Sequence, residues 1–265
     1  MTLITPFERA WHHRELIRAV VRREFASRFR DSFLGWIWAI FAPLAMLAAY
    51  TTIFSIAAPA VAQGVSILDY AAASFCGLIL YNVFAELLAR APTLMHEHAH
   101  FIKKSIFPAE TVAWTSVIRA LIYGAISFGT LIVFRLVTVH YVPWTALLFP
   151  IVVIPFTLLM LGMCWFLMAL GAFTKDVSHL MVAIVPLLMF GTPVFFSIEQ
   201  LPANIQFWFK LNLVGNFIGM VRDLVIYARL PNPLEYALCF IASYVVFLLG
   251  YRFYNEYKSV IVDVI

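Results

Sequence analysis

Long uncharged stretches alternate with short polar segments along this chain of 265 residues. Charged residues are missing from 32 to 68 and again from 136 to 174. A helix of about 20 residues is long enough to cross the roughly 30 Å hydrocarbon core of a bilayer. The pattern predicts six transmembrane helices: Phe33–Ile56, Ile67–Leu88, Thr111–Phe134, a stretch from the turn at His140–Trp144 to Phe173, Val177–Ile198 and Leu234–Phe253. An even number of crossings places both termini on one side of the membrane.

Composition excludes an ordinary soluble domain. Hydrophobic residues make up 63% of the chain and charged residues 12%, with a mean hydropathy of +0.92. Soluble domains are about half apolar and a quarter charged. We therefore expect one all-α integral membrane domain over residues 1–265, with 1–31 at the membrane surface and a six-span bundle at 33–253. The three cysteines, Cys76, Cys164 and Cys239, lie in apolar stretches, which indicates packing rather than disulfide or metal chemistry.

The basic residues predict which side the termini occupy. With the N-terminus in the cytoplasm, thirteen Lys and Arg residues lie on the cytoplasmic side and four on the other, Arg119 being left out because it lies within a span. Cytoplasmic loops of membrane proteins carry an excess of Lys and Arg. Both termini are therefore predicted to be cytoplasmic, and orientation in a bilayer explains the net charge of +4 better than nucleic-acid binding does.

The residues before the first span predict an amphipathic helix in the cytoplasmic membrane interface. One helical face is apolar and contains Leu16, Ile17, Val20 and Val21. Arginines occupy the other face, where they would meet lipid phosphates. The pattern fails after Val21, because Glu24 and Arg28 enter the apolar face. A bend or contact with another protein would explain the failure, and an ordinary solvated basic helix is the alternative.

The segment between the fifth and sixth predicted spans, residues 199–233, is too long for a simple turn. Pro202 is suited to open a short helix that reaches Leu211, and a second helix is expected from Val214 to Tyr227. Both are aromatic-rich and too short or too charged to span. We expect re-entrant or outer-surface helices beside a pathway, because such breaks are tolerated only within protein or a water-filled cavity.

The P-loop of nucleotide-binding proteins and the serine elbow of α/β-hydrolases are absent from the sequence. It contains no GxxxxGK[ST] and no GxSxG, and its predicted spans are nearly bare of ionisable residues. A proton-driven transporter normally needs such residues at mid-membrane, so a separate energy-supplying subunit is favoured. Arg119 is the exception within a span. It would either line a cavity or extend to the inner headgroups, and the sequence leaves both open.

One metal-binding motif is present. His96-Glu97-His98-Ala99-His100 matches HExxH, in which two histidines hold zinc and the glutamate is a general base. The motif lies in a polar loop, with Glu110 or Asp176 as the only plausible third ligand. A zinc-dependent membrane protease is therefore an alternative hypothesis, and a solvated or partner-facing loop is preferred.

Tryptophans cluster near the predicted span ends, at Trp36, Trp38, Trp114 and Trp144. Such positions are typical of the aromatic belts at membrane interfaces. Aromatic faces inside a channel would also stack on sugar rings. The sequence does not separate these two uses.

Three segments resemble one family. The run Arg28–Trp38 (RFRDSFLGWIW), followed by Ala42-Pro43-Leu44, resembles the opening of ABC-2 type permeases that export polysaccharides. Phe101–Glu110 (FIKKSIFPAE) is similar to the segment after their second span, and Gly219–Asp223 to their outer helix. The family usually has Asn-Pro before that helix, whereas this chain has Asn212-Leu213.

The resemblance implies a homodimer that pairs with two copies of a separate ABC ATPase, which would bind ATP and Mg²⁺. This chain would be no enzyme by itself and would hold no cofactor or metal, so the HExxH match would be incidental. Its substrate would be a lipid-linked polysaccharide, capsular or O antigen, crossing the bacterial inner membrane. A periplasmic co-polymerase or export partner would continue the route. A permease for another cargo, teichoic acid or a drug, is the second alternative.

The resemblance also implies roles for particular residues. The substrate-binding candidates are Arg28, Arg30, Trp36, Trp38 and Arg119. The candidates for coupling to the ATPase are Glu97, His98, Phe101, Lys103 and Lys104. The candidates for a periplasmic gate are Phe207, Trp208, Arg222 and Asp223.

Overall fold

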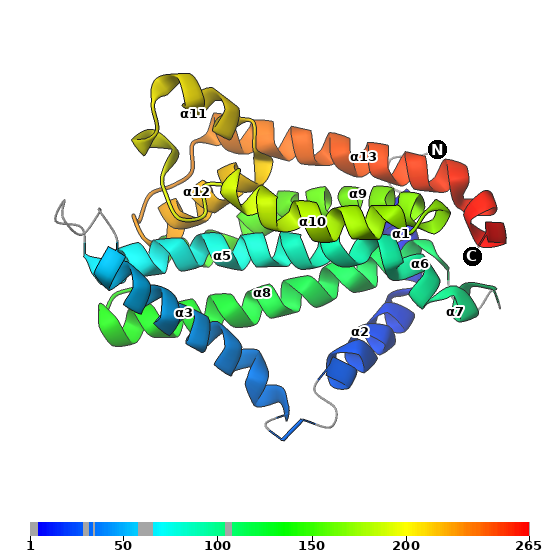
Figure 1. The fold of residues 1–265 in the computed structure, drawn as a ribbon, viewed down its shortest axis with the longest axis horizontal. Coiled ribbons are helices and arrows are strands. Elements are labelled where there is room, and N and C mark those ends of the chain that lie inside the picture. The colour runs from blue at the N-terminus through cyan, green and yellow to red at the C-terminus, as the bar shows by residue number, and fades with distance from the viewer. Residues whose placement is uncertain (1–4, 29–31, 34, 58–65, 104–107, 265) are drawn as a thin grey trace.

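The computed structural model describes residues 5–28, 32–33, 35–57, 66–103 and 108–264, and every regular element in these ranges is helical (Figure 1). The first half contains α1 (Thr5–His12), α2 (Arg14–Arg28), η1 (Gly35–Ile37), α3 (Trp38–Ala57), α5 (Ile67–Arg90), η2 (Ala91–Thr93), α6 (Leu94–Glu97), α7 (Ala99–Lys103) and α8 (Glu110–Thr138). The second half contains η3 (Trp144–Leu148), α9 (Phe149–Phe173), α10 (Asp176–Phe190), η4 (Ile198–Gln200), α11 (Ala203–Lys210), α12 (Leu213–Val225) and α13 (Pro233–Val264).

Within the part of the chain that the structure describes, four stretches of helix are long and apolar enough to cross a membrane. They are Ile67–Glu97, Glu110–Thr138, Trp144–Phe173 and Pro233–Ile261. The first stretch contains α5, and 78% of its most apolar 18-residue segment is buried inside the protein. α5 is therefore the central helix of the bundle (Figure 1). The predicted all-helical fold is confirmed for the described residues.

The bundle has two distinct ends (Figure 1). α1 and the last turns of α13 lie together at one end, which we call the terminal end, along with α6 and α7. α11 and α12 lie at the opposite end. These two short helices fall close to the ranges predicted for the outer segment.

The prediction for the fifth span is wrong at its far end. α10 stops at Phe190 instead of continuing to Ile198. Gly191 follows as the cap, and Pro193 lacks the N–H that would continue the ladder of hydrogen bonds. The 15 residues of α10 rise about 22 Å, less than the hydrocarbon thickness. The apolar stretch in α3, Trp38–Ile53, is also shorter than the four long helices, so six crossings remain a prediction.

Two connections differ from the predicted pattern. The sixth span does not end at Phe253, because α13 continues as one helix to Val264. The polar loop at residues 90–110 is partly helical, since η2, α6 and α7 occupy most of its first half. In both places, helical structure continues beyond the apolar region at the terminal end.

α9 and α13 approach each other closely at two glycines. A side chain at Gly162 would overlap the backbone at Val246 and Phe247, and one at Gly250 would overlap the backbone of Gly162. Small residues allow helix backbones to approach within a membrane, where van der Waals packing drives association. This contact fixes the position of α13 against the bundle.

The N-terminal segment packs on protein rather than presenting its apolar face to lipid. Ile17, Val20 and Val21 are buried, and α2 lies against α8. Phe25 stacks on Tyr123 of α8, with ring centroids 5.4 Å apart. Contact with the chain's own helices therefore explains why the amphipathic pattern changes after Val21.

α3 is anchored at one end only. Leu47 is 2% exposed, and Tyr50 lies against Phe195 with ring centroids 5.6 Å apart. The first half of α3 diverges from α5, and Trp38 and Phe41 are exposed there (Figure 1). A cavity lined by residues of α3, α5 and α8 lies beside this half of the helix.

Candidate functional site

A network of ionised side chains lies where α2, α5 and α8 meet near the terminal end. Glu24 of α2 accepts a hydrogen bond from Arg90 at 2.9 Å, through Oε2 and Nη1. The same oxygen lies 3.4 Å from Nη1 of Arg119, and His98 Nε2 lies 3.3 Å from Glu24 Oε1. One carboxylate thus joins α5, α8 and the α6–α7 connection.

Further carboxylates complete this network. Arg90 donates to Glu97 at 2.8 Å, and Arg119 donates to Glu86 at 3.2 Å. Glu97 also accepts a hydrogen bond of 2.6 Å from the hydroxyl of Thr93. A lone arginine within a span is costly, and pairing with the partly buried carboxylates of Glu24 and Glu86 offsets much of that cost. Arg119 is accordingly held by protein groups in this network.

The pKa of Glu24 reflects the hydrogen bonds and positive charges around its carboxylate. Burial alone would raise the pKa of this carboxyl. The hydrogen bonds from His98 and Arg90, together with the charges of Arg90 and Arg119, outweigh burial and lower the pKa from 4.5 to about 2. Glu24 is therefore ionised throughout the physiological range.

A second carboxylate anchors both chain ends at the terminal end. Glu110, at the start of α8, accepts a hydrogen bond of 2.9 Å from Arg9 of α1 and another from Lys258 of α13. Its side chain is 8% exposed, and its backbone carbonyl accepts from Trp165 Nε1 at 3.2 Å. Phe7 of α1 packs beside this site against Trp114, with ring centroids 5.7 Å apart. α1 and α13 are thereby tied to the same point of α8.

The HExxH motif does not lie on a continuous helix. α6 ends at Glu97, and His98 caps it in a non-helical conformation before α7 begins. His96 Nε2 faces the carbonyl of Gly171 at 3.3 Å, whereas His98 faces Glu24. Among the residues that the structure describes, no three His, Cys, Asp or Glu side chains gather in a way that would hold a metal. Two histidines one turn apart on a single helix, as zinc proteases require, are therefore missing from this geometry.

A cavity of about 300 Å³ lies between α3, α5 and α8. Trp38, Pro43 and Met46 form its α3 wall, with Ala39 and Ala42. The opposite walls are mixed in character and consist of Phe75, Ile79, Asn82, Glu86, Tyr123 and Ser127. Glu86 links this cavity to the ionic network through Arg119.

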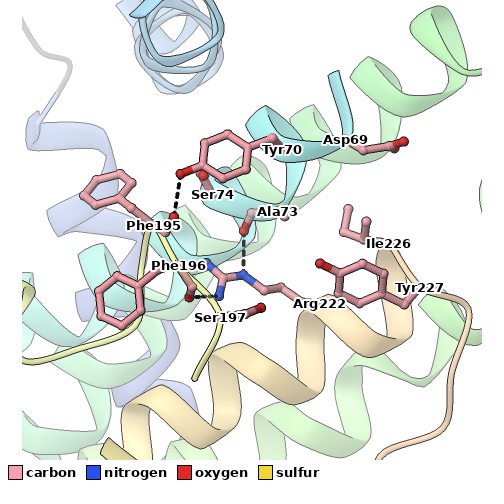
Figure 2. Close-up of a pocket in the computed structure, with 10 residues that line it drawn as sticks. All are labelled: Asp69, Tyr70, Ala73, Ser74, Phe195, Phe196, Ser197, Arg222, Ile226 and Tyr227. Atoms are coloured by element: carbon pink, nitrogen blue, oxygen red, sulfur yellow. Dashed lines mark hydrogen bonds between the residues drawn. The ribbon is translucent and has the colours of Figure 1, made fainter. Parts of the chain in front are cut away.

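At the opposite end, Arg222 clamps the turn that follows α10 (Figure 2). Its guanidinium donates to the carbonyls of Pro193 and Phe196, each at 2.9 Å, and to that of Val194. Nε donates to the carbonyl of Ala73 in α5 at 2.8 Å. Figure 2 shows the side chain reaching from α12 across to α5, where it closes one wall of a small cavity. Three carbonyls of the turn, which lies outside regular helix, are thus satisfied by one side chain that is also bound to α5.

Asp223 lines a neighbouring polar cavity of about 320 Å³ with Glu199, Tyr227 and Arg229. Burial raises the pKa of the Asp223 carboxyl, against the opposing charge of Arg229. The start of α12 is fixed by Asn212, whose side chain accepts from Gly215 N at 3.1 Å and donates to Gly191 O at 3.0 Å. This cap joins the end of α10 to α12 although no proline follows Asn212.

Comparison with known proteins places these features in a family. The family model described as ABC-2 type transporter matches residues 15–226, which is most of the chain. The chain belongs to the ABC-2 type transporter family. It is similar to the O-antigen export system permease protein RfbA of Myxococcus xanthus, 24% identical over 191 residues and 72% of each chain. Two proteins of the same name from Klebsiella pneumoniae are 20% and 21% identical over 246 residues and 92% of each chain.

The resemblance found in the sequence to permeases of polysaccharide exporters is confirmed by these matches. Together with its long apolar helices, membership of this family makes the chain a multi-pass membrane protein.

The predicted substrate-binding residues of this ABC-2 transporter are not gathered in one place. Trp38 lines the α3 cavity, whereas Arg119 is held in the ionic network behind it. Arg30 and the side chains of Arg28 and Trp36 lie outside the described residues. Their roles stay predictions.

The predicted coupling and gate residues lie at the two ends of the bundle. Glu97 and His98 belong to the terminal-end network; Lys104 and the side chains of Phe101 and Lys103 lie outside the described residues. Phe207 and Trp208 are exposed on α11. Arg222 and Asp223 are neighbours on α12, the first deeply buried and the second half-buried. Their roles in coupling and gating stay predictions.

Sequence reasoning missed Glu24, Glu86 and Glu110 as partners of the basic residues. The sequence does carry a signal for Glu24, because this residue lies on the apolar face of its helix. A carboxylate there either contacts protein groups or is buried in lipid at a high cost in free energy. Glu86 and Glu110 stand near predicted span ends, where carboxylates are ordinary. Their partners lie more than 30 residues away in sequence, so only the fold brings them together.

Proposed function

We propose that this chain is the membrane subunit of an ATP-driven exporter that moves a lipid-linked polysaccharide, O antigen or capsular, across the bacterial inner membrane. The observation that supports the proposal most is the similarity to permeases of O-antigen export systems over 92% of the chain.

In this proposal the terminal end faces the cytoplasm, in agreement with the distribution of Lys and Arg. α3, α8 and α10 run toward the periplasm, and α5, α9 and α13 return (Figure 1). α3 has 20 residues, which rise about 30 Å and suffice for a crossing. α10 would cross together with the turn that follows it, which Arg222 holds in place.

A separate ATPase would supply the energy, because the sequence contains no P-loop. The surface at the terminal end formed by α2 and the α6–α7 connection is the proposed contact. Glu24 and Arg90 join these two elements to each other and to α8. Force applied to either element would then reach the spanning helices through the network. Two copies of the chain would pair with two ATPase subunits.

Deletion of the gene, followed by fractionation of surface and intracellular glycans, tests the proposal. Polysaccharide trapped inside on its lipid carrier, and restored to the surface by the wild-type gene, is the expected result. Normal surface polysaccharide would refute export of O antigen or capsule. Teichoic acid or small-molecule export would then be examined in the same strain.

A further inference from the structure

A glycine within α12 has no packing requirement. Gly219 lies in the interior of this helix, where glycine is one of the least favourable residues. A Cβ at Gly215 would lie 2.7 Å from Pro193 Cδ, so close packing requires glycine at that position. A Cβ at Gly219, in contrast, would meet nothing within 4 Å. The absent side chain therefore keeps a space open instead of letting two segments approach.

The open space at Gly219 belongs to the polar cavity of about 320 Å³ at the α11–α12 end of the bundle. Asp223, one turn further along α12, lies on the same helical face. Glu199 comes from η4, while Tyr227 and Arg229 follow the end of α12. Binding sites for small molecules have volumes of roughly 300–1,000 Å³ and a small number of polar groups that fix the ligand. The cavity meets both conditions.

The loop after α12 is held in place beside the cavity. The N–H of Arg229 donates to the carbonyl of Asp223 at 2.8 Å. The guanidinium of Arg229 lies over the Tyr227 ring, 5.9 Å from the ring centroid. Ala228 between them has a φ of +53°, a left-handed conformation that is uncommon for residues other than glycine. These contacts hold both side chains at the cavity without a ligand.

The charged groups that line the cavity balance one another. Glu199 and Asp223 provide two carboxylates, and Arg222 and Arg229 provide two guanidiniums. Among the described residues, neither carboxylate forms an ion pair or accepts a hydrogen bond, so both are able to accept hydrogen bonds from a ligand. The balance of charge favours a neutral ligand over an anion or a cation. Hydroxyls suit this set of groups, because they donate to carboxylates and accept from guanidiniums.

We propose that this cavity binds a neutral sugar residue, with Asp223 and Glu199 accepting hydrogen bonds from its hydroxyls. Arg229 donates to the sugar oxygens, and the ring of Tyr227 packs against an apolar face of the sugar. The open position at Gly219 leaves room for the sugar ring. The further assignment of this sugar to the exported polysaccharide rests on the proposed function, in which this end of the bundle is periplasmic. The cavity would then hold a part of the chain that has already crossed the membrane.

Photolabelling of the purified full-length chain in lipid nanodiscs tests the site directly. The probe consists of short oligosaccharides that are released by mild acid from the surface polysaccharide of the strain that carries the gene, and then tagged with a diazirine. The control probe carries the same diazirine on polyethylene glycol of similar length, which has no sugar rings. Mass spectrometry identifies the labelled peptides. We expect saturable labelling by the oligosaccharides within residues 197–200 and 219–229, and none there by the control probe.

Two glycines provide a matched pair of variants. A Cβ at Gly219, or at Gly129 of α8, would meet nothing within 4 Å, but of the two only Gly219 lines the cavity. Gly219→Trp fills the cavity and should abolish saturable labelling, whereas Gly129→Trp should leave labelling unchanged. The Tm of each variant, measured in parallel, shows whether the labelled protein is folded.

Replacement of Asp223 tests the hydrogen bonds to the sugar. Asp223→Asn keeps the shape of the side chain and removes its charge, so the sugar hydroxyls lose a charged acceptor. Half-saturation of labelling should then require about fivefold more oligosaccharide. Glu235→Gln alters an exposed carboxylate at the start of α13 and should leave half-saturation unchanged. Equal shifts in the two variants would overturn the role of Asp223.

The absence of saturable labelling in the wild-type cavity, equal labelling by both probes, or saturable labelling that survives Gly219→Trp would overturn the proposal. Surface polysaccharide in cells then tests the assignment to the exported substrate. It should fall in Gly219→Trp and stay normal in Gly129→Trp. If labelling is lost while export is normal, the assignment to the exported substrate is refuted. If the gene deletion itself leaves surface polysaccharide normal, the proposed function fails while the labelling result stands alone.

Discussion

Replacing Glu24 by glutamine keeps the size of the side chain and removes the charge that Arg90, Arg119 and His98 share. The pKa of Glu24 and the usual cost of breaking an ion pair both indicate how much stability the fold loses. The pKa of Glu24 is lowered from 4.5 to about 2, which corresponds to roughly 3 kcal/mol of stabilisation at neutral pH. Removing one partner of a buried ion pair costs about 3–5 kcal/mol. We therefore expect Glu24→Gln to lower the free energy of unfolding by about 3 kcal/mol.

Thermal unfolding of the purified protein in detergent measures this loss. For a chain of this size, a change of 3 kcal/mol lowers Tm by roughly 6–12 °C. The control is Glu15→Gln, which alters an exposed glutamate on the same helix and should change Tm by no more than about 2 °C. Equal changes in the two variants would show that Glu24 is not held as the structure indicates.

The pH dependence gives an independent check of the same reasoning. The pKa of Glu24 is lower in the folded protein than in the unfolded chain, so its contribution is fully present above about pH 4.5. The contribution is lost as the pH falls from about 4.5 to about 2, because the carboxyl becomes protonated in the folded protein. The Tm difference between wild type and Glu24→Gln should therefore narrow over this window. A difference that stays constant with pH would refute an electrostatic cause.

Three other variants test the remaining contacts. Arg222→Met should reduce the stability of the fold by several kcal/mol and so lower Tm strongly, because the carbonyls of Pro193, Val194 and Phe196 lose the donor that Arg222 provides. Arg229→Met, at an exposed position, should have little effect. Gly250→Val should prevent α13 from packing and reduce the yield of folded protein, whereas Gly129→Ala, with nothing nearby, should be tolerated. Glu110→Gln should loosen α1, so that limited proteolysis within residues 5–28 becomes faster than in Glu15→Gln.

The sequence predicts the long apolar helices well because hydrophobic continuity is a local property. α5, α8, α9 and α13 each coincide with a predicted span. The prediction for α10 failed because its apolar character continues past Phe190, although the backbone turns at Gly191 and Pro193. Hydropathy does not report that turn, and Arg222 stabilises it from a distant helix.

The candidate site was less predictable because its parts come from separate helices. The sequence shows a charge at Arg119 within a predicted span, but its partners Glu24 and Glu86 lie 95 and 33 positions away in sequence. Glu24 is the residue of this site that is easiest to predict from the sequence, because a glutamate on an apolar helical face is visible in the local pattern. A charge on an apolar face therefore predicts that a partner exists, while only the fold identifies the partner.

The structure also suggests which part of the bundle is free to move. α1 and α2 are tied to α8 through Glu110 and Glu24, and these contacts join apolar packing by Ile17 and Phe25. The first half of α3 has no comparable anchor among the described residues, and Pro43 removes one hydrogen bond within the helix. Motion at the terminal end would thus carry α2 and α8 as one unit while α3 changes its separation from them. The cavity between α3, α5 and α8 would change in volume with that motion, so the ionic network and this cavity would respond to the same displacement.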